Sequence, residues 1–245
     1  MSVTQAGRGG MEWLAGGRGV SPYSAQATAA LKAAFPTQWP TIRDYGFAHP
    51  EIVGYMNAYA PEDAKIAYSL VEGIGTRWIV NEGTSYFNTG YDTNANTKWT
   101  IKFYISNYTQ NARHGESTSG ARFYIGCNNG NFITGYGSDY NHSIKTSDNK
   151  PHVATLYNAV LTFDGTNYSA GNAFTSSMRM WIFDSNGYAS NVRGGVAESI
   201  FEEEGVQIKR FIPFKRNGQM ELLDLVSGNL ATRVGTFTEL IESPS

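Results

Sequence analysis

From residue 77 onward the chain consists of short runs in which apolar and polar side chains alternate. A period of two places the apolar side chains on one face of a β-strand, so each run can bury one face and leave the other in water. Dipeptides that end in Gly lie between the runs and accept the positive φ angles of tight hairpin turns. Several such strands predict a sandwich of two sheets. The clearest runs are 98–105, 121–126, 153–157, 159–163 and 178–183, and the turn dipeptides are Asn129-Gly130, Asp164-Gly165, Asn186-Gly187 and Asn217-Gly218.

The composition agrees with a mainly β protein that lacks disulfide bonds. Of the 245 residues, 13% are aromatic, 27 are Gly and only 16% are charged, which is typical of short strands separated by glycine turns. The single Cys127 cannot form an intramolecular disulfide. The first residues also lack the apolar run of a signal peptide, so we expect synthesis and assembly in a reducing cytoplasm.

Charge and hydropathy argue against nucleic-acid and membrane partners. The formal net charge of −2 provides no long-range field that would attract nucleic acid or an anionic surface. No stretch of 18 apolar residues occurs, so we expect no membrane insertion. The basic residues of segment 208–216 are divided by apolar ones, which indicates an amphipathic strand, and we expect this strand to turn at Pro213.

Residues 1–76 form a separate segment, because their composition differs from that of the rest. Two glycine clusters, 7–10 and 16–19, surround residues 11–14, and such a composition cannot build a core of its own. We interpret this stretch as an extended tether rather than a nucleic-acid arm, because two Arg residues cannot supply the phosphate contacts of such an arm. Its candidate anchoring residues are Arg8, Met11, Trp13, Leu14 and Arg18.

Short helices are predicted after this tether. Ser21 followed by Pro22 is typical of a helix N-terminus, and the alanine-rich stretch 25–35 predicts the helix itself. Pro50 and Pro61 mark two further helix starts. Helices of this length are not stable alone, so they either attach to a partner chain or cap the β domain, and the sequence leaves both alternatives open.

Two segments carry a resemblance to a known family. Segment 78–91 contains Gly83-Thr84 and ends in Thr89-Gly90-Tyr91, and segment 208–237 runs through Asp224, Gly228, Gly235 and Phe237. These segments resemble the opening and closing motifs of concanavalin A-like (laminin-G/lectin-type) jelly-roll domains that recur in bacteriophage virion proteins. The sequence departs from the family pattern at residues 205–207, where the family has a different turn. The resemblance implies a concanavalin A-like jelly-roll sandwich over residues 77–245, preceded by a partly helical anchoring segment.

The same resemblance implies a structural role in a virion. Proteins of this kind are head- or tail-attached fibre, decoration or adhesion proteins, with capsid, portal or tail subunits as partners of the N-terminal segment. We therefore expect a non-enzymatic virion protein that forms homo-oligomers and carries a lectin-like domain for host polysaccharide. The alternative is a stand-alone bacterial carbohydrate-binding lectin domain, and a glycoside hydrolase is the least favoured hypothesis.

No catalytic or metal-binding pattern is present in the sequence. The Glu-x-Asp-x-x-Glu strand of related glycan-cleaving enzymes, which places alternate carboxylates in one cleft, does not occur. The four His residues have no metal-ligand spacing. The stretch that begins at Asp92 fails as an EF-hand, because Thr97 and Phe103 replace its Gly and Glu. We expect no cofactor, no metal and no enzymatic activity.

Sugar binding is the surface activity that the residue types favour. Aromatic faces stack on the C–H faces of pyranose rings, while Asn and Asp bond the hydroxyls. We expect stretch 128–141 to be a loop with this chemistry, although for any single residue ordinary turn composition in a Tyr-rich chain is the favoured explanation. The candidate glycan-binding residues are Asn131, Phe132, Tyr136, Asp139 and Tyr140.

Overall fold

The computed structural model describes residues 21–34, 36–37, 39–48, 53, 78–106, 112–118, 121–146, 148–171, 177, 179–186, 192–216, 219–227 and 229–240. The chain divides into two compact units, Met1–Glu72 and Gly73–Ser245. Several predictions concern residues outside the described ones and are therefore not tested. They are the anchoring residues Arg8, Met11, Trp13, Leu14 and Arg18, the helix starts at Pro50 and Pro61, and the turns at Gly187 and Asn217-Gly218.

The first helix of the N-terminal unit confirms a prediction but begins later than expected. Helix α2 (Ala25–Ala34) covers the alanine-rich stretch. Its cap is Ser24, whose hydroxyl oxygen accepts a hydrogen bond from the Ala27 amide at 3.2 Å. The expectation that Ser21 caps the helix is wrong, because the Ser21 hydroxyl oxygen instead accepts hydrogen bonds from the Tyr23 amide and the Thr28 hydroxyl.

Helix α3 (Trp39–Ala48) has no counterpart among the predictions from sequence. Pro40 falls in its first turn, where the missing N–H is not needed. Tyr23 ties the start of the unit to α3, because its hydroxyl donates to the Ile42 carbonyl at 2.7 Å. Its ring also lies 6.0 Å from that of Trp39. The side chains of Leu31 and Ile42 are buried, so the unit has a small apolar centre.

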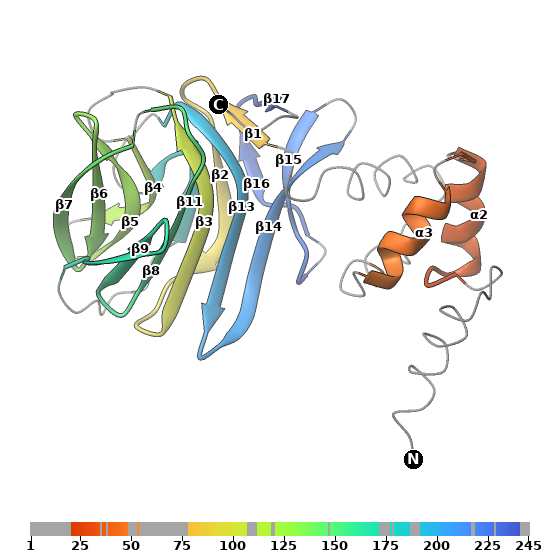
Figure 1. Ribbon diagram of the computed structural model, residues 1–245, viewed down its shortest axis with the longest axis horizontal. Helices are drawn as coiled ribbons and strands as arrows, with labels where there is room; N and C mark the ends of the chain where they lie inside the picture. The colour runs from red at the N-terminus through yellow and green to blue at the C-terminus, as the bar shows by residue number, and fades with distance from the viewer. Residues whose placement is uncertain are drawn as a thin grey trace, which may run out of the picture. The chain divides into compact units, whose positions relative to one another are not determined.

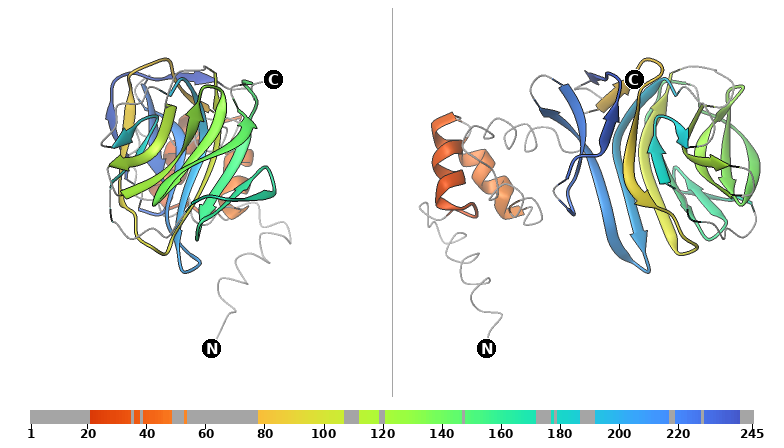
Figure 2. Two further views of the ribbon diagram at one scale, coloured as in Figure 1. Left: turned by 90° about the vertical axis from the view of Figure 1, so that its left-hand side faces the viewer. Right: turned by 180° about the vertical axis from the view of Figure 1, so that it is seen from behind.

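The C-terminal unit is a sandwich of two antiparallel β-sheets (Figures 1 and 2), which confirms the predicted mainly β sandwich. Sheet A has nine described strands, and β14 (Val206–Arg216) and β15 (Gln219–Asp224) extend it beyond its main path. The main path runs in the order β10 (Thr166–Ser169), β9 (Val160–Phe163), β8 (His152–Tyr157), β3 (Thr97–Ile105), β13 (Gly194–Glu203), β1 (Trp78–Asn81) and β17 (Thr238–Leu240).

Sheet B has eight described strands. Seven form an antiparallel path, and the short β12 (Ser185–Asn186) pairs parallel with a strand of that path. The path runs in the order β16 (Thr232–Val234), β2 (Tyr86–Asp92), β11 (Arg179–Ile182), β4 (Ala112–Thr118), β5 (Ala121–Asn128), β6 (Asn131–Tyr136) and β7 (Ser138–Lys145), and β12 pairs with β4.

One hydrophobic core fills the space between the sheets. On β3 the side chains of Trp99, Ile101 and Phe103 are fully buried, whereas the residues between them are partly exposed, as the alternating pattern predicts. The Trp99 ring stacks on that of Phe201 at 5.7 Å between centroids. Its indole N–H donates to the Ser199 hydroxyl at 2.9 Å, so the only polar atom of this large side chain is satisfied.

The two ends of the β domain pair with each other. Strand β1 lies against β17, with Trp78 opposite Leu240, and β2 lies against β16. The Phe87 and Phe237 rings stack at 4.3 Å between centroids. The opening segment therefore pairs with β16 of the closing segment and with β17, which directly follows that segment (Figure 1).

Three hairpin turns show why glycine follows a polar residue in this chain. The predicted turns at Asn129-Gly130 and Asp164-Gly165 are confirmed, with φ of 51° and 76° in the first and 46° and 84° in the second. Where the sequence departs from the family pattern, the turn lies at Glu204-Gly205, with φ of 52° and 81°. Two consecutive positive φ angles are the mark of a type I′ turn, which matches the twist of the strands.

The turn expected at Pro213 is wrong, because β14 continues through this residue. Pro213 lies opposite Leu222 of β15. The pairing of β14 with β13 ends at Phe211, so none of the described strands on that side requires a hydrogen bond from position 213. A proline is accepted in a strand at such an unpaired position.

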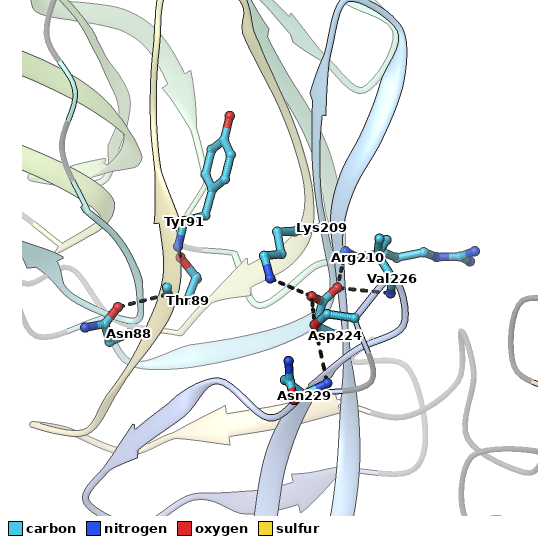
Figure 3. A network of polar contacts seen from close by, with 10 residues as sticks. Asn88, Thr89, Tyr91, Lys209, Arg210, Asp224, Val226 and Asn229 are labelled. Atoms are coloured by element: carbon cyan, nitrogen blue, oxygen red, sulfur yellow. Dashed lines mark hydrogen bonds and ion pairs between the residues drawn. The ribbon is translucent and has the colours of Figure 1, made fainter. Parts of the chain in front are cut away.

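Asp224 of the closing segment lies at the centre of a buried polar network (Figure 3). Its carboxylate is only 1% exposed and accepts hydrogen bonds from Lys209 Nζ at 2.9 Å and from the Arg210 and Val226 amides at 3.0 and 3.1 Å. Burial disfavours the charged form, but these bonds and one from the Ser227 hydroxyl outweigh it and lower the pKa of Asp224. The network fastens the turn after β15 to β14.

Candidate functional site

The stretch expected to be a sugar-binding loop is a hairpin formed by β6 and β7. Gly137, with φ of 71°, connects the two strands. Phe132 faces the core, is fully buried, and lies 4.8 Å from the Phe163 ring. Tyr136 also faces inward and is only 4% exposed. The prediction that these two aromatic residues bind a glycan is therefore wrong, because neither ring has a face open to a ligand.

Tyr136 has a structural role, because the backbone of a neighbouring turn forms hydrogen bonds with its buried hydroxyl. Its hydroxyl is hydrogen-bonded by the backbone at Ala159 and Asn158, and these bonds oppose the effect of burial, which raises the pKa of Tyr136. Asn158 and Ala159 form the turn between β8 and β9, with φ of 49° and 59°. Tyr136 thus joins β6 of sheet B to a turn of sheet A.

The other three candidates lie at the surface, but they do not converge. The Asn131 side-chain oxygen accepts a hydrogen bond from Lys145 Nζ at 2.8 Å. Asp139 forms an ion pair with Arg122 and accepts a hydrogen bond from a tyrosine hydroxyl. Tyr140 follows Asp139 directly on β7, so their side chains leave opposite faces of the strand. The carboxylate and the aromatic ring therefore cannot contact one sugar together.

Tyr140 belongs to an aromatic group at the edge of the sandwich. It is 44% exposed, and its ring lies 5.1 Å from that of His142. His142 lies 5.9 Å from Tyr168 on β10 of the other sheet. Partial burial lowers the pKa of His142 to about 4, so its ring is neutral at pH 7. The predicted role of Tyr140 stays open.

A groove lies on the outer face of sheet A. It has a volume of about 260 Å³ and crosses strands β3, β8, β9 and β10. In Figure 1 the β8–β9 hairpin lies beside β3. We call this feature the outer groove. Its lining residues are Lys98, Thr155, Tyr157, Asn158, Val160, Thr162 and Asn167.

One part of the outer groove is aromatic and apolar. Tyr157 of β8 lies opposite Val160 of β9, and the two side chains are 44% and 40% exposed. Lys98 Nζ forms an ion pair with Glu202 Oε2 at 2.8 Å, so its charge is compensated. An exposed ring beside an aliphatic side chain provides a surface for the apolar face of a ligand.

The other part is polar. The Thr155 hydroxyl bonds the Thr100 hydroxyl at 2.9 Å, and the Thr162 hydroxyl donates to the Asn167 side-chain oxygen at 2.7 Å. The outer groove therefore combines hydroxyl and amide groups with one open aromatic ring. The outer groove was not predicted from the sequence, although a signal existed. In run 153–157 the aromatic residue Tyr157 occupies a solvent-facing position, which polar residues usually occupy.

Asp92, at the start of the stretch compared with an EF-hand, forms an ion pair with Arg179. The Arg179 guanidinium hydrogen-bonds Asp92 at 2.6 and 3.0 Å and lowers the pKa of that carboxyl group, so Asp92 is already paired. Within the described residues, no three His, Cys, Asp or Glu side chains are arranged to hold a metal ion. None of the described helices is both long and apolar enough to cross a membrane.

Comparisons with known proteins support the fold. No protein-family model matches the sequence, and no curated protein matches it either. Among solved structures, a proposed carbohydrate-binding protein from Bacteroides ovatus ATCC 8483 is similar, with a TM-score of 0.52 and 12% sequence identity. The similarity covers 69% of this chain and 61% of the other, so the chain spans less than two thirds of that structure. At this identity the likeness shows the sandwich fold alone.

Proposed function

We propose that the β domain binds carbohydrate, and that the outer groove is its binding site. The observation that carries the proposal is the exposed Tyr157 ring beside the hydroxyls of Thr155 and Thr162. A pyranose has an apolar C–H face and a rim of hydroxyls, and this groove offers a partner for each. The fold that the chain shares with the Bacteroides ovatus protein supports the proposal by analogy.

We propose further that binding occurs without cleavage. Glycoside hydrolases place two carboxyl groups on either side of the scissile bond, roughly 5 to 10 Å apart. The described residues that line the outer groove include no carboxylate. Incubation with any bound polysaccharide is expected to release no reducing ends, and a measurable release that persists after repurification would contradict this part.

A glycan array probed with the full chain tests the proposal, and two tyrosines make it specific. Tyr157 and Tyr140 are both 44% exposed but lie on different sheets. We expect Tyr157→Ala to weaken binding at least about 10-fold, or about 1.4 kcal/mol, because the stacking surface is lost. Tyr140→Ala serves as the matched control and is expected to bind normally.

Each other outcome has a defined meaning. Loss of binding in the Tyr140→Ala variant alone would place the site at the edge formed by β7 and β10. No binding to any glycan would reject the proposal. Circular dichroism of both variants checks that the fold is unchanged.

A virion role is our second proposal, and it rests on the resemblance of segments 78–91 and 208–237 to phage virion domains. In this proposal residues 1–76 attach the chain to capsid, portal or tail subunits, as a homo-oligomer assembled in the host cytoplasm. Carbohydrate binding would then serve attachment to host polysaccharide. The test is mass spectrometry of gradient-purified particles, and particles that lack this chain would reject it.

A further inference from the structure

Four polar side chains form a straight row on the outer face of sheet A. Thr100 lies opposite Thr155, Thr155 lies opposite Thr162, and Thr162 lies opposite Asn167. These residues belong to the adjacent strands β3, β8, β9 and β10. Neighbouring strands are about 4.8 Å apart, so the row is roughly 14 Å long and runs at right angles to the strands. We call it the polar row.

The polar row is held in order by its own hydrogen bonds and keeps capacity for a ligand. Thr100 bonds Thr155 at 2.9 Å, and Thr162 donates to Asn167 at 2.7 Å. A threonine hydroxyl has one donor and two acceptor positions, so each retains an acceptor after such a bond. The Asn167 side chain uses its oxygen, and its two N–H donors have no bond to another described residue.

An apolar strip accompanies the polar row. Tyr157 and Val160 lie on the same face as Thr155 and Thr162, two positions along their strands, and both are exposed. The outer groove therefore has a polar and an apolar side that both extend across strands. A site for one terminal sugar would instead gather its donors around a single ring.

We propose that the outer groove binds an internal stretch of a linear, neutral polysaccharide that lies across strands β3, β8, β9 and β10. This inference rests on the proposed carbohydrate-binding function. The repeat of a linear glycan is similar to the spacing of strands, so about three successive sugars meet successive members of the polar row. Lys98 is the charged residue among those that line the groove, and its ion pair with Glu202 compensates its charge. This favours an uncharged polysaccharide as the ligand.

Affinity as a function of chain length tests this inference. Isothermal titration of the full chain would use cello-, xylo- and manno-oligosaccharides of one to six residues. The expected result for the recognised series is an increase of at least about 10-fold from one to three or four sugars, followed by a plateau. Uronic-acid oligomers of the same lengths are expected to bind more weakly.

Two variants make the test residue-specific. Asn167→Ala removes the last member of the polar row. It is expected to reduce the increase in affinity that the third or fourth sugar provides by about 10-fold, and to leave the affinity for the shortest oligosaccharides unchanged. Thr155→Val removes a central hydroxyl at constant shape and is expected to weaken all lengths. Thr232→Ala, an exposed change on sheet B, is the control and should alter nothing.

The outcomes separate this inference from the function on which it rests. Equal affinity for a monosaccharide and a hexasaccharide would overturn the linear-chain inference but keep carbohydrate binding. Binding on the glycan array to branched or charged glycans alone would also overturn it. An absence of any glycan binding would reject both proposals.

Discussion

At the scale of single residues, Gly235 shows how a closing motif depends on the absence of a side chain. Its φ is +88°, and a Cβ atom at this position would collide with Ser85. The neighbouring Thr236 amide donates to the Ser85 hydroxyl oxygen at 3.0 Å. The close approach of these two segments is part of what closes the sandwich, so glycine is required for space as well as for backbone conformation.

We expect Gly235→Ala to lower the free energy of unfolding by about 2 to 4 kcal/mol, because strain and collision add. Gly165 is a matched control, since its φ of +84° is similar but a Cβ atom there would have no atom within 4 Å. Gly165→Ala should cost only about 1 kcal/mol, from backbone strain alone. Urea unfolding measures the free energy of unfolding of both variants. Equal losses would contradict the expected collision of a side chain at position 235 with Ser85.

His114 is the residue that should link stability to mild acid. It is fully buried, and its Nδ1 accepts a hydrogen bond from the Phe183 amide at 3.1 Å. Burial lowers its pKa from 6.5 to about 3. Below pH 6.5 the unfolded chain therefore binds a proton at His114 that the folded chain does not bind. The free energy of unfolding falls as the pH decreases toward 4.

The expected slope for one such proton is about 1.4 kcal/mol per pH unit. His142 acts in the same direction, because its pKa is also lowered. His114→Asn retains an acceptor for the Phe183 amide but cannot titrate, so its stability should be lower at pH 7 and less dependent on pH between 6.5 and 4. Urea unfolding at several pH values measures this, and an unchanged slope would contradict the assignment.

At the scale of elements, the Asp224 network decides how β14 and β15 are held. Asp224→Asn keeps the shape but leaves Lys209 without its charged partner, and we expect a loss of about 2 to 4 kcal/mol. Asp92→Asn breaks an ion pair with Arg179 that is exposed on both sides, and should cost less than about 1 kcal/mol. Thermal unfolding compares the two, and a similar loss in both variants would argue against the network.

Asp224 also has its own pH dependence, which is separate from that of the histidines. Its pKa is lowered from 3.8, so its stabilising effect is fully present above pH 4 and is lost as the pH falls further. The stability of the wild-type chain should therefore fall in two pH ranges, one between pH 6.5 and 4 and the other below pH 4. The Asp224→Asn variant is expected to lose less stability in the lower pH range, where carboxyl groups such as Asp92 also have a lowered pKa.

At the scale of the whole molecule, closure by the last strand is the feature to test. A chain that ends at Phe237 lacks β17 and leaves β1 at the edge of sheet A. Trp78, which is only 1% exposed, would then reach water. We expect a red shift of tryptophan fluorescence. We also expect Tm to decrease by roughly 2 to 4 °C for each kcal/mol by which the free energy of unfolding is lowered. An apolar edge strand should also promote aggregation.

A single substitution provides the control for this truncation. Leu240→Ala keeps the β17 backbone pairing but removes the side chain that packs on the Trp78 cluster. Its effect on Tm should be smaller than that of the truncation. A truncated chain with unchanged Tm and fluorescence would show that β17 contributes nothing to closure.

The mainly β sandwich could be predicted from the amino-acid order, because strand periodicity and turn chemistry are local properties. The runs around Trp99 and Leu161 and the turn at Asp164-Gly165 follow directly from it. The first helix was also predictable from its alanine content, whereas α3 was not, because contacts such as the hydrogen bond from Tyr23 to the Ile42 carbonyl arise only when the unit packs.

Which aromatic residues are exposed to water became clear from the three-dimensional arrangement of the strands. Phe132 and Tyr157 both lie on short β-strands, yet one is buried between the sheets and the other lines the outer groove. The face that a strand turns to the core depends on register with its neighbours, and that register is set by strands far away in the sequence. The polar row exists for the same reason, since four separate strands must align to form it.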